Sequence, residues 1–111
     1  MKIHLIKKQT ILDFVNKNSQ SAKAFFAWFA IIKWADWSKP KDIIDTFGNA
    51  DILGGNSKRV VFNIGGNKYR MICGYYFGKE KVHLFVKWIG THSDYTKLCN
   101  ENKQYSVDLF N

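Results

Sequence analysis

The stretch comprising residues 59–95 constrains the fold most strongly, because it holds three strand-like runs separated by two glycine turns. Gly65 and Gly66 lie between the first two runs, and glycine readily adopts the positive φ angles that a two-residue hairpin turn requires. Gly78 and Lys79 mark the second turn. Side chains alternate between the two faces of a strand, so these turns determine which residues share a face. The stretch therefore predicts consecutive antiparallel strands.

A turn at Gly65 and Gly66 predicts that Ile64 pairs with Asn67 and that Phe62 pairs with Tyr69. One face of the predicted sheet then carries apolar side chains, namely Val60, Phe62, Ile64, Tyr69, Met71, Cys73, Tyr75, Val82, Leu84 and Val86. The opposite face gathers Arg59, Asn63, Lys68, Arg70 and Lys87. The alternation therefore predicts an apolar core on one side of the sheet and a basic surface on the other.

Two short blocks inside this stretch, residues 62–70 (FNIGGNKYR) and residues 88–95 (WIGTHSDY), resemble the HigB-type toxins of the RelE superfamily. Two positions depart from the usual pattern, because Lys87 stands where these toxins more often have arginine and Thr96 where an acidic residue often follows the tyrosine. The resemblance implies a RelE-like α+β fold and a ribosome-dependent mRNA endonuclease that inhibits translation. It also implies a cognate helix-turn-helix, HigA-like antitoxin that silences the toxin.

Length and charge limit the remaining possibilities. A chain of 111 residues has room for one domain, so we expect a single domain over residues 1–111. The formal net charge of +8 favours an anionic partner. Nucleic acid is the leading candidate, and a membrane surface or an acidic protein is the alternative. Aromatic residues make up 16% of the chain, and unstacked RNA bases pack on aromatic rings, although most aromatic side chains belong to protein cores.

The cysteines and the apolar runs bear on the compartment. Cys73 and Cys99 form neither a disulfide framework nor a metal-binding spacing, which fits a reducing environment. The first ten residues, MKIHLIKKQT, lack the apolar region of a signal peptide. The longest apolar run, residues 24–32, is shorter than a membrane span of roughly 20 residues. We expect a cytoplasmic protein without a metal or cofactor.

The N-terminal half shows helical periodicity. A short strand is expected at Lys2–Ile6, followed by helices at residues 7–17, 22–36 and 41–47 and a loop at residues 48–57. The second helix is apolar nearly all round, which predicts burial on more than one side. The alternative is that part of its aromatic surface accepts an antitoxin segment. The predicted fold is α+β, with two N-terminal helices packed on one face of a small, mainly antiparallel, twisted sheet. Val107, Leu109 and Phe110 are expected either to add a last strand or to fray.

The predicted chemistry is metal-independent RNA cleavage by attack of the 2′-hydroxyl on the adjacent phosphate. His92 is the candidate general acid or base, because imidazole titrates near neutrality. Arg70 and Lys87 are the candidate cations for the developing negative charge. The candidate RNA-binding residues are Arg59, Asn63, Lys68 and Tyr95.

Each candidate also has a structural interpretation, because a sheet needs a polar face and His92 could cap a strand end. A second hypothesis is therefore a non-catalytic basic module that binds RNA or an acidic protein through the same face. Only cleavage, and its loss on His92→Ala, separates the two hypotheses.

Overall fold

The computed structural model describes residues 1–110 and contains one mixed sheet with helices on both sides. The elements follow in the order β1 (Lys2–Ile6), α1 (Lys8–Lys17), a 3₁₀ turn (Ser19–Ser21), α2 (Ala22–Trp34), α3 (Pro40–Phe47), β2 (Asp51–Leu53), β3 (Arg59–Ile64), β4 (Tyr69–Phe77), β5 (Lys81–Thr91) and α4 (His92–Asn100). The predicted α+β fold is confirmed. Among the described residues, no helix is both long enough and apolar enough to span a membrane.

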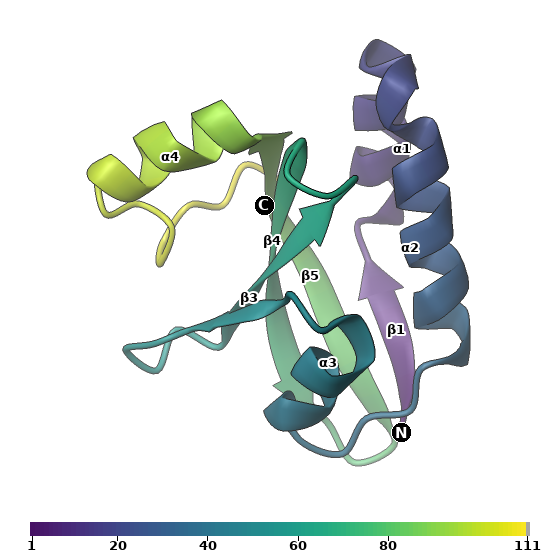
Figure 1. The fold of residues 1–111 in the computed structure, drawn as a ribbon. Coiled ribbons are helices and arrows are strands. Elements are labelled where there is room, and N and C mark those ends of the chain that lie inside the picture. Colours follow the sequence, from purple (N-terminus) through teal and green to yellow (C-terminus); the bar gives the residue numbers. More distant parts are fainter. Residues whose placement is uncertain (111) are drawn as a thin grey trace.

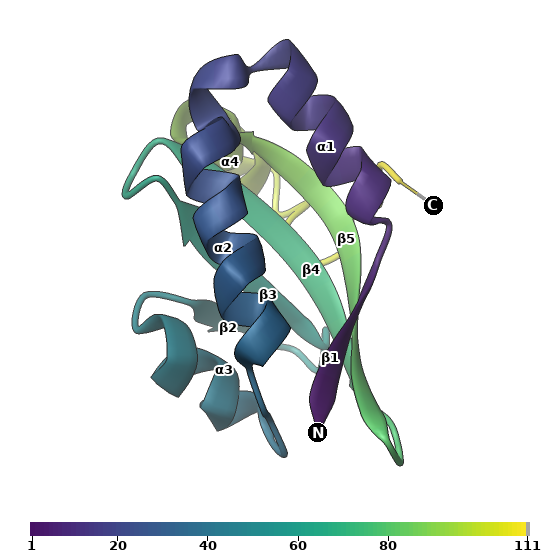
Figure 2. The ribbon, with the colours of Figure 1, turned by 90° about the vertical axis from the view of Figure 1, so that its right-hand side faces the viewer.

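The sheet has the strand order β1-β5-β4-β3-β2 (Figure 1). Strand β1 runs parallel to β5, with Lys2 opposite Lys81, and the other neighbours are antiparallel. Helices α1 and α2 cover one face, as predicted, whereas α4 and the chain that follows it lie on the opposite side (Figures 1 and 2). The two faces of the sheet are therefore covered by different parts of the chain.

The β3–β4 hairpin has a longer loop than the sequence predicts. Ile64 pairs with Tyr69, so the predicted pairing of Ile64 with Asn67 was wrong by two residues. Gly65 and Gly66 do adopt positive φ angles of 66° and 69°, but the loop extends through Lys68, whose amide donates to the Gly65 carbonyl at 3.3 Å. A shift of two residues preserves the faces of a strand, so the predicted face assignments of β3 and β4 remain correct.

A β-bulge between β4 and β5 changes the neighbours of Arg70. Cys73 pairs with Val86 and Ile72 pairs with Trp88, which leaves Lys87 as the extra residue. Arg70 lies opposite Asn63 through the hairpin register and opposite Gly90 on the far side of the bulge. The positions of the turns cannot reveal this bulge, because they fix the strand pairing only as far as the inserted residue, and the side chains of β5 alternate regularly between the two faces up to that point.

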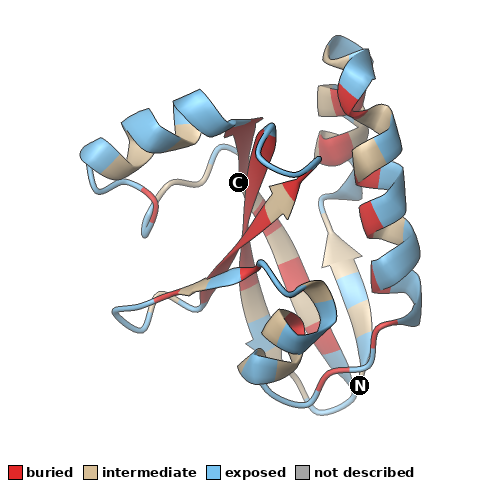
Figure 3. Ribbon diagram, in the orientation of Figure 1, coloured by how far each residue is buried: buried red, intermediate tan, exposed pale blue. Residues whose placement is uncertain are grey.

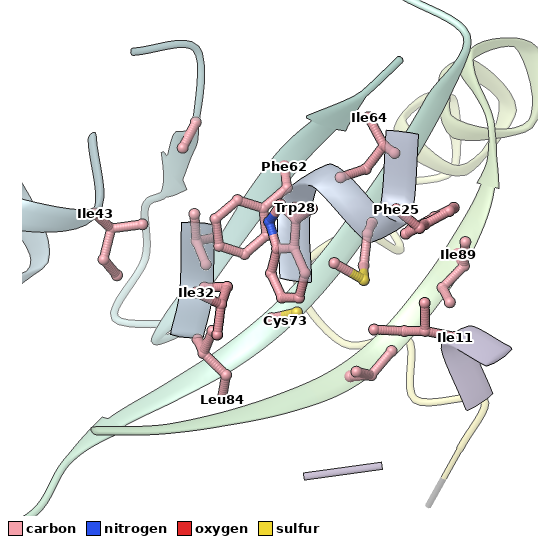
Figure 4. Close-up of a cluster of buried hydrophobic side chains, with 14 of the residues drawn as sticks. Ile11, Phe25, Trp28, Ile32, Ile43, Phe62, Ile64, Cys73, Leu84 and Ile89 are labelled. Atoms are coloured by element: carbon pink, nitrogen blue, oxygen red, sulfur yellow. The ribbon is translucent and has the colours of Figure 1, made fainter. Parts of the chain in front are cut away.

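The main core lies between α2 and the sheet (Figure 4). Phe25, Trp28 and Ile32 of α2 are buried, and the Trp28 ring packs edge-on against Phe62 at 5.2 Å between centroids. The opposite side of the same helix faces solvent (Figure 3). The exposed fractions there are 51% for Phe26, 43% for Ile31 and 74% for Trp34. The prediction that α2 is buried on more than one side was therefore wrong.

The face of the sheet opposite α2 is less polar than predicted. Val61, Ile72 and Trp88 form a second buried cluster there together with Leu53. The side chains packed against this cluster come from α4 and the chain beyond it, namely Tyr95, Leu98 and Val107. Helix α4 is therefore held to the sheet by an apolar contact, which fixes the position of its first turn.

Residues 101–110, which we call the C-terminal segment, cross this second face. Arg59 donates to the carbonyls of Val107 and Gln104 at 2.6 and 3.3 Å, respectively. The Leu109 amide donates to the Lys87 carbonyl at 2.9 Å. The segment is thus attached to β3 and β5 by specific hydrogen bonds, although it forms no strand.

Candidate functional site

Arg70 is the charged centre of the candidate site. It lies on β4 between two other strands and is only 8% exposed. Its Nη1 donates to the Tyr69 carbonyl at 3.1 Å, and its Nη2 donates to the Asn67 side-chain oxygen at 3.3 Å. Within residues 1–110 no ion pair involves this guanidinium. Its position is therefore fixed by neutral acceptors, and its charge remains available to an anion.

Gly90, which pairs with Arg70, lies directly beneath the Trp88 ring. A Cβ atom at Gly90 would lie 2.6 Å from the Trp88 ring, so the indole occupies the space above this glycine. The Trp88 ring also contacts Tyr95, with 6.0 Å between centroids. Gly90 pairs with Arg70 on the next strand, so the indole covers the glycine that lies opposite Arg70. Trp88 thus packs between this glycine and Tyr95 of α4.

His92 is the first residue of α4, directly after the strand β5. Thr91 caps the helix, because its hydroxyl accepts from the Asp94 amide and the Asp94 carboxylate accepts from the Thr91 amide, at 3.1 and 3.3 Å. The His92 amide donates to the Lys68 carbonyl at 3.0 Å, which joins the helix to the β3–β4 loop. The imidazole is exposed at the positive end of the helix dipole.

Tyr95 follows one turn later and is half-buried against the second cluster. Burial raises the pKa of its hydroxyl, and a hydrogen bond with the Cys99 side chain acts in the same direction. The positive charge of Arg70 acts on this pKa in the opposite direction. The phenol is therefore neutral at physiological pH and is suited to hydrogen bonding rather than to accepting a proton as a base.

The remaining predicted residues fall into two groups. Asn63 is half-buried beside Arg70, and Lys68 is exposed in the adjoining loop. Arg59 and Lys87 instead contact the C-terminal segment. Burial lowers the pKa of Arg59, which the Asp108 carboxylate partly offsets. The prediction that Arg59 extends an exposed basic surface was wrong, because its side chain is buried under carbonyl groups.

Lys87 forms an ion pair with Asp108 at 2.9 Å, and both side chains are about three-quarters buried, with 26% and 25% exposed. It shares a face of the sheet with Arg70 but is separated from it by the bulge. The structure thus brings Arg70, Asn63, Lys68, His92 and Tyr95 to one end of the sheet, and holds Arg59 and Lys87 beneath the C-terminal segment. In residues 1–110 no group of three or more His, Cys, Asp or Glu side chains could hold a metal ion.

Sequence reasoning missed three residues that shape the site. Asn67 holds the Arg70 guanidinium, and its position after two turn glycines was a usable signal. Trp88 belongs to the second sequence block but was given no role. A tryptophan two residues before a glycine lies on the same face of a strand, so its ring can cover the glycine. Asp108 gave no signal, because its partner Lys87 is remote in sequence and the intervening segment has no regular periodicity.

Comparison with known proteins assigns the chain to a family. A family model described as the HigB toxin, a RelE-like toxic component of a toxin-antitoxin system, matches residues 21–98. The match includes β3, β4, β5 and most of α4, and hence Arg70, His92 and Tyr95. The chain belongs to the HigB toxin family.

Individual members of the HigB family are similar over nearly the whole chain. The mRNA interferase HigB of Escherichia coli O6:H1 is 31% identical over 105 residues, which cover 92% of this chain and 100% of the relative. The mRNA interferase toxin HigB of Escherichia coli K12 is 27% identical over 93 residues, which cover 84% of this chain and 88% of the relative. The HigB of Shigella flexneri matches to the same extent as the K12 protein. The resemblance first noted in two short blocks therefore extends across the fold.

Proposed function

We propose that this HigB-family chain is an endoribonuclease that cleaves mRNA on the ribosome and thereby inhibits translation in the cytoplasm. The observation that carries the proposal is the fixed, unneutralised guanidinium of Arg70 at the end of the sheet where α4 presents the exposed His92. The names of the similar proteins, which describe mRNA interferases, support the same substrate class.

The proposed reaction needs no group beyond the RNA and the protein. The 2′-oxygen of the nucleotide before the scissile bond attacks phosphorus and loses its proton, while the bond from phosphorus to the 5′-oxygen breaks and that oxygen gains a proton. The products are a 2′,3′-cyclic phosphate and a 5′-hydroxyl. His92 is proposed to transfer one of these protons, and Arg70 to stabilise the negative charge that grows on the phosphate oxygens.

The other residues are proposed to position RNA. Tyr95 offers a ring and a neutral hydroxyl to a base or a phosphate, and Asn63 and Lys68 extend the contact surface along the β3–β4 hairpin. Lys87 is a weaker candidate for the catalytic set, because an RNA phosphate would have to displace Asp108 from it. Arg59 is proposed to act indirectly, by holding the C-terminal segment in place.

The proposed partner that silences the chain is a cognate antitoxin of the helix-turn-helix, HigA-like kind. The family description places its members in toxin-antitoxin systems, and a net charge of +8 suits an acidic partner. In this proposal DNA is contacted only through the antitoxin.

The decisive experiment compares the purified wild-type chain with His92→Ala on translating ribosomes and on naked mRNA. The proposal expects cleavage by the wild type only when ribosomes are present, 2′,3′-cyclic phosphate ends on the products, and loss of cleavage in the variant with RNA affinity retained. Wild-type protein that binds RNA and never cleaves it would instead establish a non-catalytic binding module. Cleavage of naked mRNA at the same rate would remove the ribosome from the proposal.

A further inference from the structure

Helix α2 carries a second apolar stripe that no part of residues 1–110 covers. Its exposed residues Phe26, Ala27, Ala30, Ile31 and Trp34 recur at intervals of three and four, so they form one continuous line along the helix. This line, which we call the α2 stripe, is exposed, whereas Phe25, Trp28 and Ile32 of the same helix are buried in the core. Contiguous apolar surface of this kind on a globular protein marks an interaction site.

The shape of the α2 stripe suits another helix. The two alanines lie between the large side chains of Phe26 and Trp34, so a partner backbone can approach closely at the centre while its side chains pack at either end. A groove of about 410 Å³ adjoins the stripe and is lined by residues that include Leu5, Phe26, Phe29 and Ala30. A side chain from a partner helix could fill this groove as a knob fills a hole.

Lysines surround the α2 stripe. The Lys8 ammonium lies 4.9 Å from the centroid of the Phe29 ring. Those of Lys33 and Lys2 lie 5.4 and 5.9 Å from the Trp34 ring. Helix α2 contains no Asp or Glu, and the carboxylate that follows it, Asp36, is bound by the N-terminal ammonium. The rim of the stripe is therefore positive and complements glutamate or aspartate side chains.

We propose that the α2 stripe is the docking surface for an amphipathic helix with acidic flanks that belongs to the antitoxin. The proposal rests on the proposed function only for the existence of that partner. The apolar side chains favour a protein helix over nucleic acid, because Ile31 and the alanines offer neither a hydrogen bond nor a stacking surface to a base. The stripe lies across the sheet from α4 (Figure 1), and Ile31 and Trp34 lie at its end farther from Lys68, so substitutions at these two positions leave the candidate site intact.

The test uses the full chain and the product of the reading frame adjacent to its gene. Ile31→Glu and Trp34→Glu each remove apolar contact and place a negative charge against the acidic flanks, so each is expected to weaken binding roughly 30-fold or more. Tyr76→Glu is the matched control. Tyr76 is 62% exposed on β4, and this substitution replaces an exposed aromatic side chain by a negative charge outside the stripe. Binding is measured by titration calorimetry at two salt concentrations, and folding by circular dichroism.

Three results would overturn the proposal. They are unchanged binding by the folded stripe variants, absence of any complex between the wild type and the neighbouring product, and a concentration-dependent dimer of the wild type that Trp34→Glu dissociates. The last result would identify the stripe as a self-association surface. Cleavage by each free variant is measured separately. If the wild type binds the neighbouring product through the stripe but does not cleave mRNA, the proposed enzyme function is wrong and the assignment of the stripe as the docking surface stands.

Discussion

The guanidinium Nη2 of Arg70 lies 3.3 Å from the side-chain oxygen of Asn67, so a neutral residue of the β3–β4 loop holds the charge of the candidate site in place. An acidic residue in the position of Asn67 would position the guanidinium equally well but would neutralise it. A neutral acceptor orients the group and leaves its charge for a substrate. This arrangement is the one that transition-state stabilisation requires, because the donor does not have to reorganise when charge develops.

Arg70→Ala is expected to lower the rate of mRNA cleavage on the order of 10²–10³, by analogy with other preorganised donors to a developing oxyanion. Arg70→Lys should recover only part of this loss, because a point charge replaces a planar fork. Lys81→Ala is the matched control, since it removes the same charge from an exposed position near the opposite end of β5. Wild-type cleavage by a folded Arg70→Ala protein would place the active site elsewhere.

His92→Ala is expected to reduce cleavage by roughly 10²–10⁴-fold, the usual contribution of a positioned proton-transfer group. RNA affinity should change little, because the imidazole is exposed and makes no side-chain hydrogen bond among residues 1–110. The helix should persist, since Thr91 and Asp94 provide its cap. The measurements are single-turnover cleavage on ribosomes and binding of a non-cleavable RNA with a 2′-deoxy substitution. An equal loss of affinity and rate would instead assign His92 to RNA binding.

Gly90→Ala is expected to destabilise the protein by about 1–3 kcal/mol, the usual cost of overpacking a filled site. The new Cβ would lie 2.6 Å from the Trp88 ring, so the indole must move, and Tyr95 must move with it. Cleavage should therefore fall along with stability. Gly74→Ala is a suitable comparison, because its Cβ would meet the far end of a long side chain, Lys87, at 3.3 Å rather than a rigid ring. Urea denaturation of both variants decides the matter, and equal stabilities would show that Trp88 is free to repack.

Lys87→Met is expected to lower cleavage less than Arg70→Ala does, because Asp108 already neutralises Lys87. The lost ion pair should cost up to about 1 kcal/mol of folding free energy, the usual value for pairs with solvent access. Asp108→Asn frees the ammonium and serves as the counterpart. If Lys87 acts on the scissile phosphate, Asp108→Asn should cleave faster than the wild type, and Lys87→Met should be as inactive as Arg70→Ala.

Asp42 predicts a pH dependence of stability. Its carboxylate accepts from the Ser38 and Lys39 amides at 2.8 and 3.2 Å, and the Ser38 amide above all holds its pKa below the ordinary value of 3.8. A lowered pKa in the folded state means that this contribution to stability is present above pH 3.8 and is lost as the pH falls through the folded value. Asp42→Asn should therefore be less stable than the wild type at pH 7, and the difference should shrink below pH 3.8. Asp45→Asn, which removes an exposed carboxylate of the same helix that pairs with Lys41, is the matched control.

The local elements of this fold could be predicted from the sequence because their signals are local. Alternation and glycines located β3, β4 and β5, and the strand at Lys2–Ile6 was predicted with its observed bounds. The bulge at Lys87 is an interruption of the alternation along β5. The contact between Arg59 and the C-terminal segment joins residues that are 45 or more positions apart in the sequence. No period in the sequence encodes either feature.

The candidate site was predictable to the same extent. Arg70 lies in the first sequence block, and His92 and Tyr95 lie in the second. Strand pairing brings the two blocks together, and helix geometry places Tyr95 one turn after His92. The solvent-facing side of α2 could not be predicted. Phe25 and Phe26 are adjacent residues of the same type, and only the packed structure buries Phe25 and exposes Phe26.

The position of β1 at the edge of the sheet has a consequence for how the protein is made. Among the strands of residues 1–110, β1 is the first to leave the ribosome, yet its neighbour in the sheet is β5, which is synthesised last. Helix α2 likewise must wait for β3, β4 and β5 before Phe25 and Trp28 have a surface to cover. The N-terminal third therefore remains unpacked throughout most of elongation, and the pairing that completes the sheet closes a long loop at the end. The activity that we propose therefore requires β5 to have left the ribosome, because Arg70 and α4 are both held in place by that strand.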